Sequence, residues 1–157
     1  MEEQILDETK FDEKQYVVFK LGAEIFGLDI NKVKEIIVYQ DTTQLPGTME
    51  QIEGVINLRG NIIPIYDLRK KFGFPEVEYS RSTRIIVVEV HDSTVGIIVD
   101  GVSEVLMISG KIIEKPSSIV TSEVDGNYIT GIAKMDQHMV IILNLNKVIN
   151  VSMDQAV

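Results

Sequence analysis

An internal repeat limits the folds that this chain can adopt. The block YVVFKLGAEIFGLDINKVKEII, which begins at Tyr16, is similar to a later block that begins at Arg84, and matched residues such as Gly27 and Gly96 lie 69 positions apart. A second block, which begins at Gly54, matches one that begins at Gly131, 77 positions later. The later half therefore carries eight extra residues between its two blocks. Two related structural units, whose repeated segments superpose about an axis, are predicted.

Both halves have the pattern of short β-strands. Hydrophobic residues make up 45% of the chain, and Ile and Val, which suit the pleated surface of a sheet, dominate them. Apolar runs alternate with Gly, Asp, Asn and Pro, which is typical of a β-sandwich or of β-barrels. Four hairpins are predicted: Tyr16–Leu21 with Glu24–Ile30, Gly54–Arg59 with Asn61–Asp67, Arg84–Val90 with Thr94–Val99, and Asn127–Met135 with Met139–Leu143.

Three short helices are also predicted. One covers Asn31–Val38, where Asp29 or Asn31 could cap the first turn. The other two, Asp67–Phe72 and Asn144–Ile149, occupy equivalent places in the repeat, and the later one is expected to extend toward Met153. The fold expected overall is mostly β, with short helices between the strands.

Residues 1–14 are predicted to be an acidic flexible tail, residues 15–150 a domain of two β-barrel halves (about 16–75 and 84–150), and residues 151–157 a C-terminal tail. Exchange of strands between the halves is left open. The tail lacks the apolar core of a signal peptide, and no apolar run approaches the length that spans a membrane. A cytoplasmic protein without membrane insertion is expected.

Charge and composition narrow the possible activities. The net charge is −9, and no cluster of Lys and Arg is visible, as nucleic-acid binding requires. Cysteine is absent, and no phosphate-binding loop or nucleophile elbow occurs. His91 and His138 lie in predicted turns without carboxylates at metal-ligand spacing. No catalytic, cofactor or metal site is expected.

The repeat also shows where the two halves differ. Arg59-Gly60 aligns with Asp136-Gln137, so this sharp turn belongs to the first half alone. Gly60 supplies the positive φ that a tight turn needs, and the planar guanidinium of Arg59 suits a carboxylate. A second interpretation makes Arg59 an ordinary solvated turn residue.

Apolar residues in the segment 30–38 have two interpretations as well. Val33, Ile36 and Ile37 match Val102, Val105 and Leu106 in the second half. Most such residues face a core. A small barrel has little room for all of them, so some are expected to line an exposed groove between the halves, and such patches often mark partner sites.

Four blocks stand out along this chain, in the order YVVFKLGAEIFGLDINKVKEI, GVINLRGNIIPIYDLRKKFG, GIIVDGVSEVL and TGIAKMDQHMVIILNLNKVI. In this order they resemble the blocks of the CheW family of chemotaxis adaptors, and GVINLRGNIIPIYDLRKKFG resembles the family's signature segment. The resemblance covers about residues 15–150. It implies two SH3-like five-stranded β-barrels related by a pseudo-twofold axis, without catalytic activity. The chain is too short to include a kinase module or a receiver domain.

The resemblance also implies two partners. One is the regulatory domain of the histidine kinase CheA, bound mainly by the first barrel, and the other is the cytoplasmic tip of methyl-accepting chemotaxis receptors, bound in the groove between the barrels. The motif residues carried over are Glu35, Gly54, Arg59 and Gly60, and Gly54 is expected to allow a close backbone approach. The groove residues carried over are Val17, Ile30, Val33, Ile36 and Val102.

Some questions stay open at this point. Glu35 and Arg59 could pair with each other, contact the receptor, or orient loops. A different class of function, a β-barrel that binds a small molecule, would need a closed apolar pocket with a few convergent polar groups.

Overall fold

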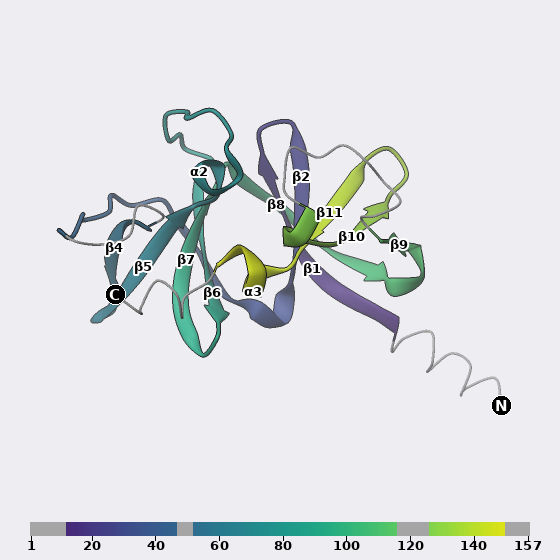
Figure 1. Cartoon of the computed structure of the whole chain (residues 1–157), viewed down its shortest axis with the longest axis horizontal. Coiled ribbons are helices and arrows are strands. Elements are labelled where there is room, and N and C mark those ends of the chain that lie inside the picture. The colour runs from purple at the N-terminus through teal and green to yellow at the C-terminus, as the bar shows by residue number, and fades with distance from the viewer. Residues whose placement is uncertain (1–11, 47–51, 116–125, 150–157) are drawn as a thin grey trace.

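The computed structural model describes residues 12–46, 52–115 and 126–149, which form two β-sheets lying side by side (Figure 1). One sheet has six strands in the order β8-β1-β2-β11-β10-β9, and the other has five in the order β3-β6-β7-β5-β4. The strands are β1 (Glu13–Leu21), β2 (Glu24–Asp29), β3 (Val33–Val38), β4 (Ile52–Leu58), β5 (Asn61–Asp67), β6 (Arg84–Val90), β7 (Ser93–Val99), β8 (Gly101–Ser109), β9 (Ile113–Glu114), β10 (Ile129–Lys134) and β11 (Met139–Leu143).

Each sheet combines strands from both halves of the repeat. The hairpin β1–β2 pairs with strands of the second half, through β8 on one side and β11 on the other. The hairpin β6–β7 pairs in the same way with β3 and β5 of the first half. The two halves therefore exchange their first hairpins, and neither range of the repeat, 16–75 or 84–150, forms a sheet of its own.

Both sheets curl so that the chain beyond one edge strand returns to the opposite edge. In the five-stranded sheet, Thr43, beyond β3, forms a bridge with Val55 of β4. In the six-stranded sheet, β9, beyond β8, pairs with β10. Curling of this kind leaves little exposed sheet edge, as in small barrels. The predicted mostly-β fold with two similar units is confirmed, and the two sheets are called the five-stranded and six-stranded barrels below.

The predicted helix over 31–38 is wrong. Ile30–Lys32 form one 3-10 turn (η1), in which the Asp29 carboxylate accepts a hydrogen bond from the Asn31 amide at 2.9 Å, and Val33–Val38 then form β3. The matching residues Gly101–Ser109 form β8. β-branched side chains favour the strand, and pairing with β6 satisfies the backbone of β3. Side chains of β3 alternate between half-buried and exposed, which is the period of a strand.

The two other helices form as predicted. Helix α2 (Leu68–Phe72) begins after Asp67, whose carboxylate accepts a hydrogen bond from the Arg69 amide at 2.9 Å, and it ends at Gly73, where φ is 77°. Helix α3 (Leu145–Val148) begins after Asn144, which makes no side-chain cap. The extension of α3 toward Met153 falls outside the described residues.

Buried apolar residues of the described chain gather in separate clusters. One lies within the five-stranded barrel and one within the six-stranded barrel, whereas the largest contains residues of both sheets and joins them. Strand β6 contributes Ile85 and Val87 to the barrel interior and Ile86 and Val88 to the shared cluster. Burial on both faces explains why this strand is apolar almost throughout. Gly96 fits the same interior closely, because a β-carbon there would lie 2.5 Å from the Ile65 side chain.

Candidate functional site

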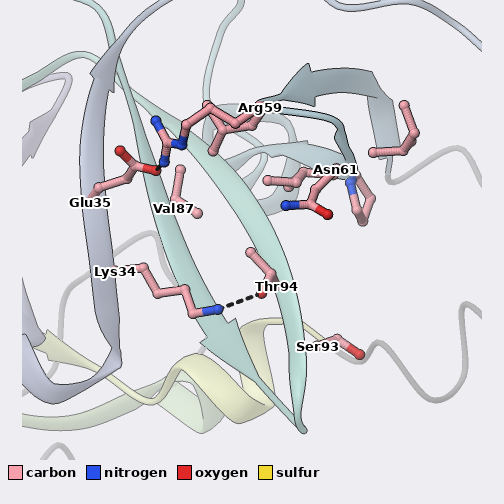
Figure 2. Close-up of a pocket in the computed structure, with 11 residues that line it drawn as sticks. Lys34, Glu35, Arg59, Asn61, Val87, Ser93 and Thr94 are labelled. Carbon is pink, nitrogen blue, oxygen red and sulfur yellow. Dashed lines mark hydrogen bonds and ion pairs between the residues drawn. The ribbon is translucent and has the colours of Figure 1, made fainter.

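Glu35 and Arg59 form an ion pair on the surface of the five-stranded barrel. Glu35 lies on β3 and Arg59 in the β4–β5 turn, and the guanidinium Nη2 donates to the carboxylate Oε1 (Figure 2). The Arg59 side chain is 69% exposed and that of Glu35 is 31% exposed. In the isolated chain, therefore, Glu35 pairs with Arg59. An ion pair this exposed adds little stability and stays available to a partner.

The turn that carries Arg59 is tight. Arg59 and Gly60 both have positive φ, at 51° and 91°, which is the geometry of a two-residue hairpin turn. The Gly60 amide donates to the Asn57 side-chain oxygen at 2.8 Å. Gly60 therefore has the positive φ predicted for it, and the turn holds the Arg59 side chain above the barrel surface.

A hollow of about 760 Å³ lies beside this ion pair. Figure 2 shows Glu35 and Arg59 at one end of the hollow and Lys34 at the other, where its Nζ donates to Thr94 Oγ1 at 2.9 Å. Ile62, another lining residue, is 63% exposed. The hollow opens on the surface, whereas the barrel interior is filled by its own side chains. A site of this shape suits a protein partner better than an enclosed small ligand.

Exposed apolar residues of the five-stranded barrel, one of which lines the hollow, recur on the other barrel. Ile36, Val38 and Ile62 are exposed on the five-stranded barrel, and their repeat partners Val105, Met107 and Met139 are exposed on the six-stranded barrel. These two sets are called the first and second apolar trios. The prediction named Ile36 alone among the six. The repeat alone matches Ile62 with Met139. For the residues of β3 and β8, the side chains that point outward can be predicted only once these segments are known to be strands, in which side chains alternate.

Charge distinguishes the two trios. The ion pair Glu35–Arg59 accompanies the first trio, whereas the equivalent residues beside the second trio are Glu104 and Asp136, both acidic and exposed. The repeat has therefore kept an apolar surface on each barrel while placing a cation on the five-stranded barrel. The sequence showed the same difference, since Arg59 of the first half aligns with Asp136 of the second half.

The predicted groove residues do not all reach the surface. Val17 is 2% exposed and belongs to the shared core cluster, so it is not a groove residue. Ile30, Val33 and Val102 are half-buried and pack against that same cluster. Ile36 is exposed on β3. Val33 pairs with Val88 of β6 and Val102 with Phe19 of β1, at equivalent places in the two sheets.

Gly54 makes the close backbone approach expected of it. A β-carbon at this position would lie 2.7 Å from the Thr43 carbonyl oxygen and 2.8 Å from the Thr42 hydroxyl. The amide and carbonyl of Thr43 bond to those of Val55 at 2.9 and 2.8 Å. Gly54 thus permits the closure of the five-stranded barrel at the Thr43–Val55 bridge.

Asp67, His91 and His138 are titratable groups that lie outside this ion pair. Asp67 is buried, and burial raises its pKa, although the Tyr79 hydroxyl donates to it at 3.1 Å. His91 and His138 lie in turns and are exposed, as predicted. Across the residues that the structure covers, no three acidic or imidazole side chains gather as metal ligands. Within the same ranges, no helix has the length and apolarity to cross a bilayer.

Comparison with known proteins agrees with this architecture. The family model described as CheW-like domain matches residues 15–153. The chain is 38% identical over 137 residues to a chemotaxis protein CheW of Klebsiella aerogenes, covering 87% of this chain and 82% of that protein. It is 34% identical over 149 residues to a chemotaxis protein CheW of Bacillus subtilis, covering 95% and 94%.

A solved structure shows the same fold. The crystal structure of the scaffolding protein TtCheW from Thermoanaerobacter tengcongensis aligns with a TM-score of 0.79 and 44% identity, covering 86% of each chain. The family model and the solved structure each match most of the chain. The chain belongs to the CheW-like domain family.

Proposed function

We propose that this protein is a non-enzymatic chemotaxis adaptor that couples methyl-accepting chemotaxis receptors to the histidine kinase CheA in a signalling array. Membership of the CheW-like family supports the adaptor role. The observation that carries the proposal is the exposed Ile62, which lines the same hollow as the Glu35–Arg59 pair, because protein interfaces commonly combine apolar anchors with an Arg. The adaptor acts in the cytoplasm and joins membrane arrays through its partners.

The five-stranded barrel is the proposed docking surface for the regulatory domain of CheA. It contains β3, β4 and β5, which bear the first trio and Arg59. The domain would cover Ile36, Val38 and Ile62, and a carboxylate on it could share Arg59 with Glu35. The six-stranded barrel has equivalent apolar residues but no counterpart of Arg59, so specificity for the five-stranded barrel would come from charge.

The repeat supplies a matched control for this docking surface. Ile62→Glu places a carboxylate in the first trio, and Met139→Glu does the same at the equivalent position of the second trio. Both side chains are at least half exposed, so both variants should fold. Calorimetric titration of the kinase domain should show a loss of about tenfold or more for Ile62→Glu, or about 1.4 kcal/mol, and a small change for Met139→Glu. A larger loss for Met139→Glu would contradict the assignment.

The receptor is proposed to bind where β3 and β8 begin, at Val33 and Val102. The receptor tip is a helical hairpin by family inference, and helices dock through apolar anchors in a groove. Both valines are half-buried, so a partner can cover their exposed parts. A carboxylate buried there without a partner is strongly unfavourable. Val33→Glu or Val102→Glu should therefore weaken receptor binding about tenfold or more.

Stability must be measured beside that binding, because both valines also pack on the shared core cluster. Ile112→Glu, at an exposed apolar residue in the 3-10 turn η2 (Gly110–Ile112), is the control for a new surface charge. Variants that melt like the wild type yet bind the receptor hairpin undiminished would remove Val33 and Val102 from the site. Variants that melt far below the wild type would assign these valines to the core.

A further inference from the structure

Two hairpin turns reach from one barrel to the other. The β1–β2 turn of the six-stranded barrel, at Gly22, meets Arg69 and Asp100, and α2 with Arg69 follows β5 of the five-stranded barrel. The β6–β7 turn of the five-stranded barrel, at His91, meets Asn146 on α3, which follows β11 of the six-stranded barrel. Gly22 and His91 are equivalent in the repeat, as are Arg69 and Asn146. The barrels are therefore linked by two crossings of the same ancestry.

The first crossing is a charged three-way junction. Arg69 Nε donates to Asp100 Oδ1 at 2.8 Å, and Arg69 Nη2 donates to Asp100 Oδ2 at 2.6 Å. Asp100 Oδ2 also accepts the Gly22 amide at 2.7 Å, and the Asp100 amide donates to the Lys20 carbonyl at 3.0 Å. The side chains of Arg69 and Asp100 are 13% and 29% exposed. The contact between Arg69 and Asp100 is strong, because it joins two partly buried opposite charges through two parallel hydrogen bonds.

Arg69 is fixed from a further direction. Its Nη1 donates to the Pro75 carbonyl at 2.7 Å, which attaches the chain that follows α2. Burial would raise the pKa of Asp100, but the hydrogen bonds from Arg69 and from the Gly22 amide outweigh it, and the pKa of Asp100 lies below its ordinary value. The carboxylate is thus held in its charged form, with donors from both barrels.

The second crossing is much weaker. His91 Nε2 lies 3.1 Å from the Asn146 carbonyl oxygen, and both residues are exposed. The residue equivalent to Asp100 is Asn31, which is exposed and whose amide bonds locally to Asp29. Among the described residues, the second crossing therefore has one solvent-exposed hydrogen bond to a backbone carbonyl where the first has a bidentate ion pair.

We infer that the Arg69–Asp100–Gly22 junction is a brace that, beside the shared core cluster, holds the two barrels more tightly at this crossing than the His91 contact does at the other. Asp100 lies two residues before Val102, and both line a hollow of about 380 Å³ with Lys20, Gly22 and Ser82. Arg69 and Asp100 are therefore positioning residues for receptor binding at the start of β8. This last step rests on the proposed function, whereas the brace itself does not.

Distances between spin labels test the brace in the free protein. The chain has no cysteine, so introduced cysteines can be labelled without background. Ala23→Cys with Glu78→Cys spans the brace, and Glu89→Cys with Lys147→Cys spans the His91 crossing, all four at exposed positions. Double electron–electron resonance should give a narrower distribution of spin-label distances across the brace than across the His91 crossing. Equal widths would overturn the asymmetry.

Variants at the brace are matched to a control on the same helix. Arg69→Lys keeps the charge but loses the fork that binds Asp100 twice, and Asp100→Asn keeps the shape but loses the charge. Lys70→Met removes an ion pair with Glu53 that lies within the five-stranded barrel, where Nζ and Oε2 are 2.8 Å apart. Both brace variants should broaden the Ala23–Glu78 distribution, and Lys70→Met should leave it unchanged. Equal broadening by Lys70→Met, or none by Arg69→Lys, would overturn the brace.

Receptor binding tests the positioning role separately. In variants that melt within a few degrees of the wild type, Arg69→Lys should weaken binding of a receptor hairpin at least threefold, and His91→Ala should leave it unchanged. Broadened distances with unchanged affinity would overturn the positioning role and leave the brace standing. A wild-type chain that does not bind the receptor would instead reject the proposed function, with the distance results unaffected.

Discussion

Replacing Gly54 with alanine tests how the five-stranded barrel closes. The added β-carbon would lie 2.7 Å from the Thr43 carbonyl oxygen, 2.8 Å from the Thr42 hydroxyl and 2.9 Å from the Thr42 β-carbon. The carbonyl is part of the backbone, so the segment that contains Thr42 and Thr43 must move as a unit. That movement disrupts the two hydrogen bonds between Thr43 and Val55.

The cost follows from these contacts. Overpacking of a well-packed site costs about 1–3 kcal/mol, and each hydrogen bond contributes about 1 kcal/mol net. We expect Gly54→Ala to lower the free energy of unfolding by about 3–5 kcal/mol, which corresponds to a fall in Tm of roughly 6–20 °C for a chain of this size. Thermal unfolding followed by circular dichroism measures this shift.

Gly126→Ala is the matched control, because a β-carbon at Gly126 meets nothing within 4 Å. Its Tm should lie within about 2 °C of the wild type, as for most surface changes. The kinase affinity of Gly54→Ala should also fall, since β4 leads into the turn that holds Arg59. A Gly54→Ala variant that melts with the wild type would refute the closure that the structure describes.

Two further predictions concern charged groups. Asp100→Asn should lower Tm at neutral pH. Because the pKa of Asp100 is depressed in the folded protein, its charge stabilises the fold above the ordinary pKa of 3.8, and this stabilisation is lost as pH falls through the folded pKa. The difference in Tm between variant and wild type should therefore close in acid, and a difference that widens there would contradict the ion pair. Arg59→Ala should change the free energy of unfolding by less than about 1 kcal/mol, because its ion pair with Glu35 is exposed. The same variant should weaken kinase binding severalfold in calorimetry. Loss of stability without loss of binding would show that Arg59 has only a structural role.

Much of the fold was predictable because it depends on local patterns and on the repeat. Turn residues such as Gly60 and alternating apolar runs placed the hairpins, and Asp67 marked the start of α2. The exchange of hairpins was not predictable, because a repeat specifies which segments are alike and not which copies pair. A helix over 31–38 is predicted because Asp29 or Asn31 could cap its first turn, and periodicity over so short a segment does not distinguish a helix from a strand.

The candidate site was predictable in part for the same physical reasons. The contrast between Arg59 and Asp136 singled out a cation that the structure places against Glu35. Val17 was misplaced because strands buried on both faces are apolar at every position, so sequence cannot separate their core side from a surface side. The Arg69–Asp100 contact joins residues 31 positions apart, and no sequence pattern announces that pairing.

Bridging of the two partners tests the central proposal most directly. Receptor cytoplasmic hairpins in a membrane-mimicking assembly would be mixed with the kinase regulatory domain and sedimented, with and without this protein. The proposal predicts that the kinase domain sediments when the wild-type chain is present and that Ile62→Glu abolishes its recovery while leaving the adaptor bound to the receptor. Sedimentation of the kinase domain to the same extent without the chain, or undiminished with Ile62→Glu, would contradict the proposal.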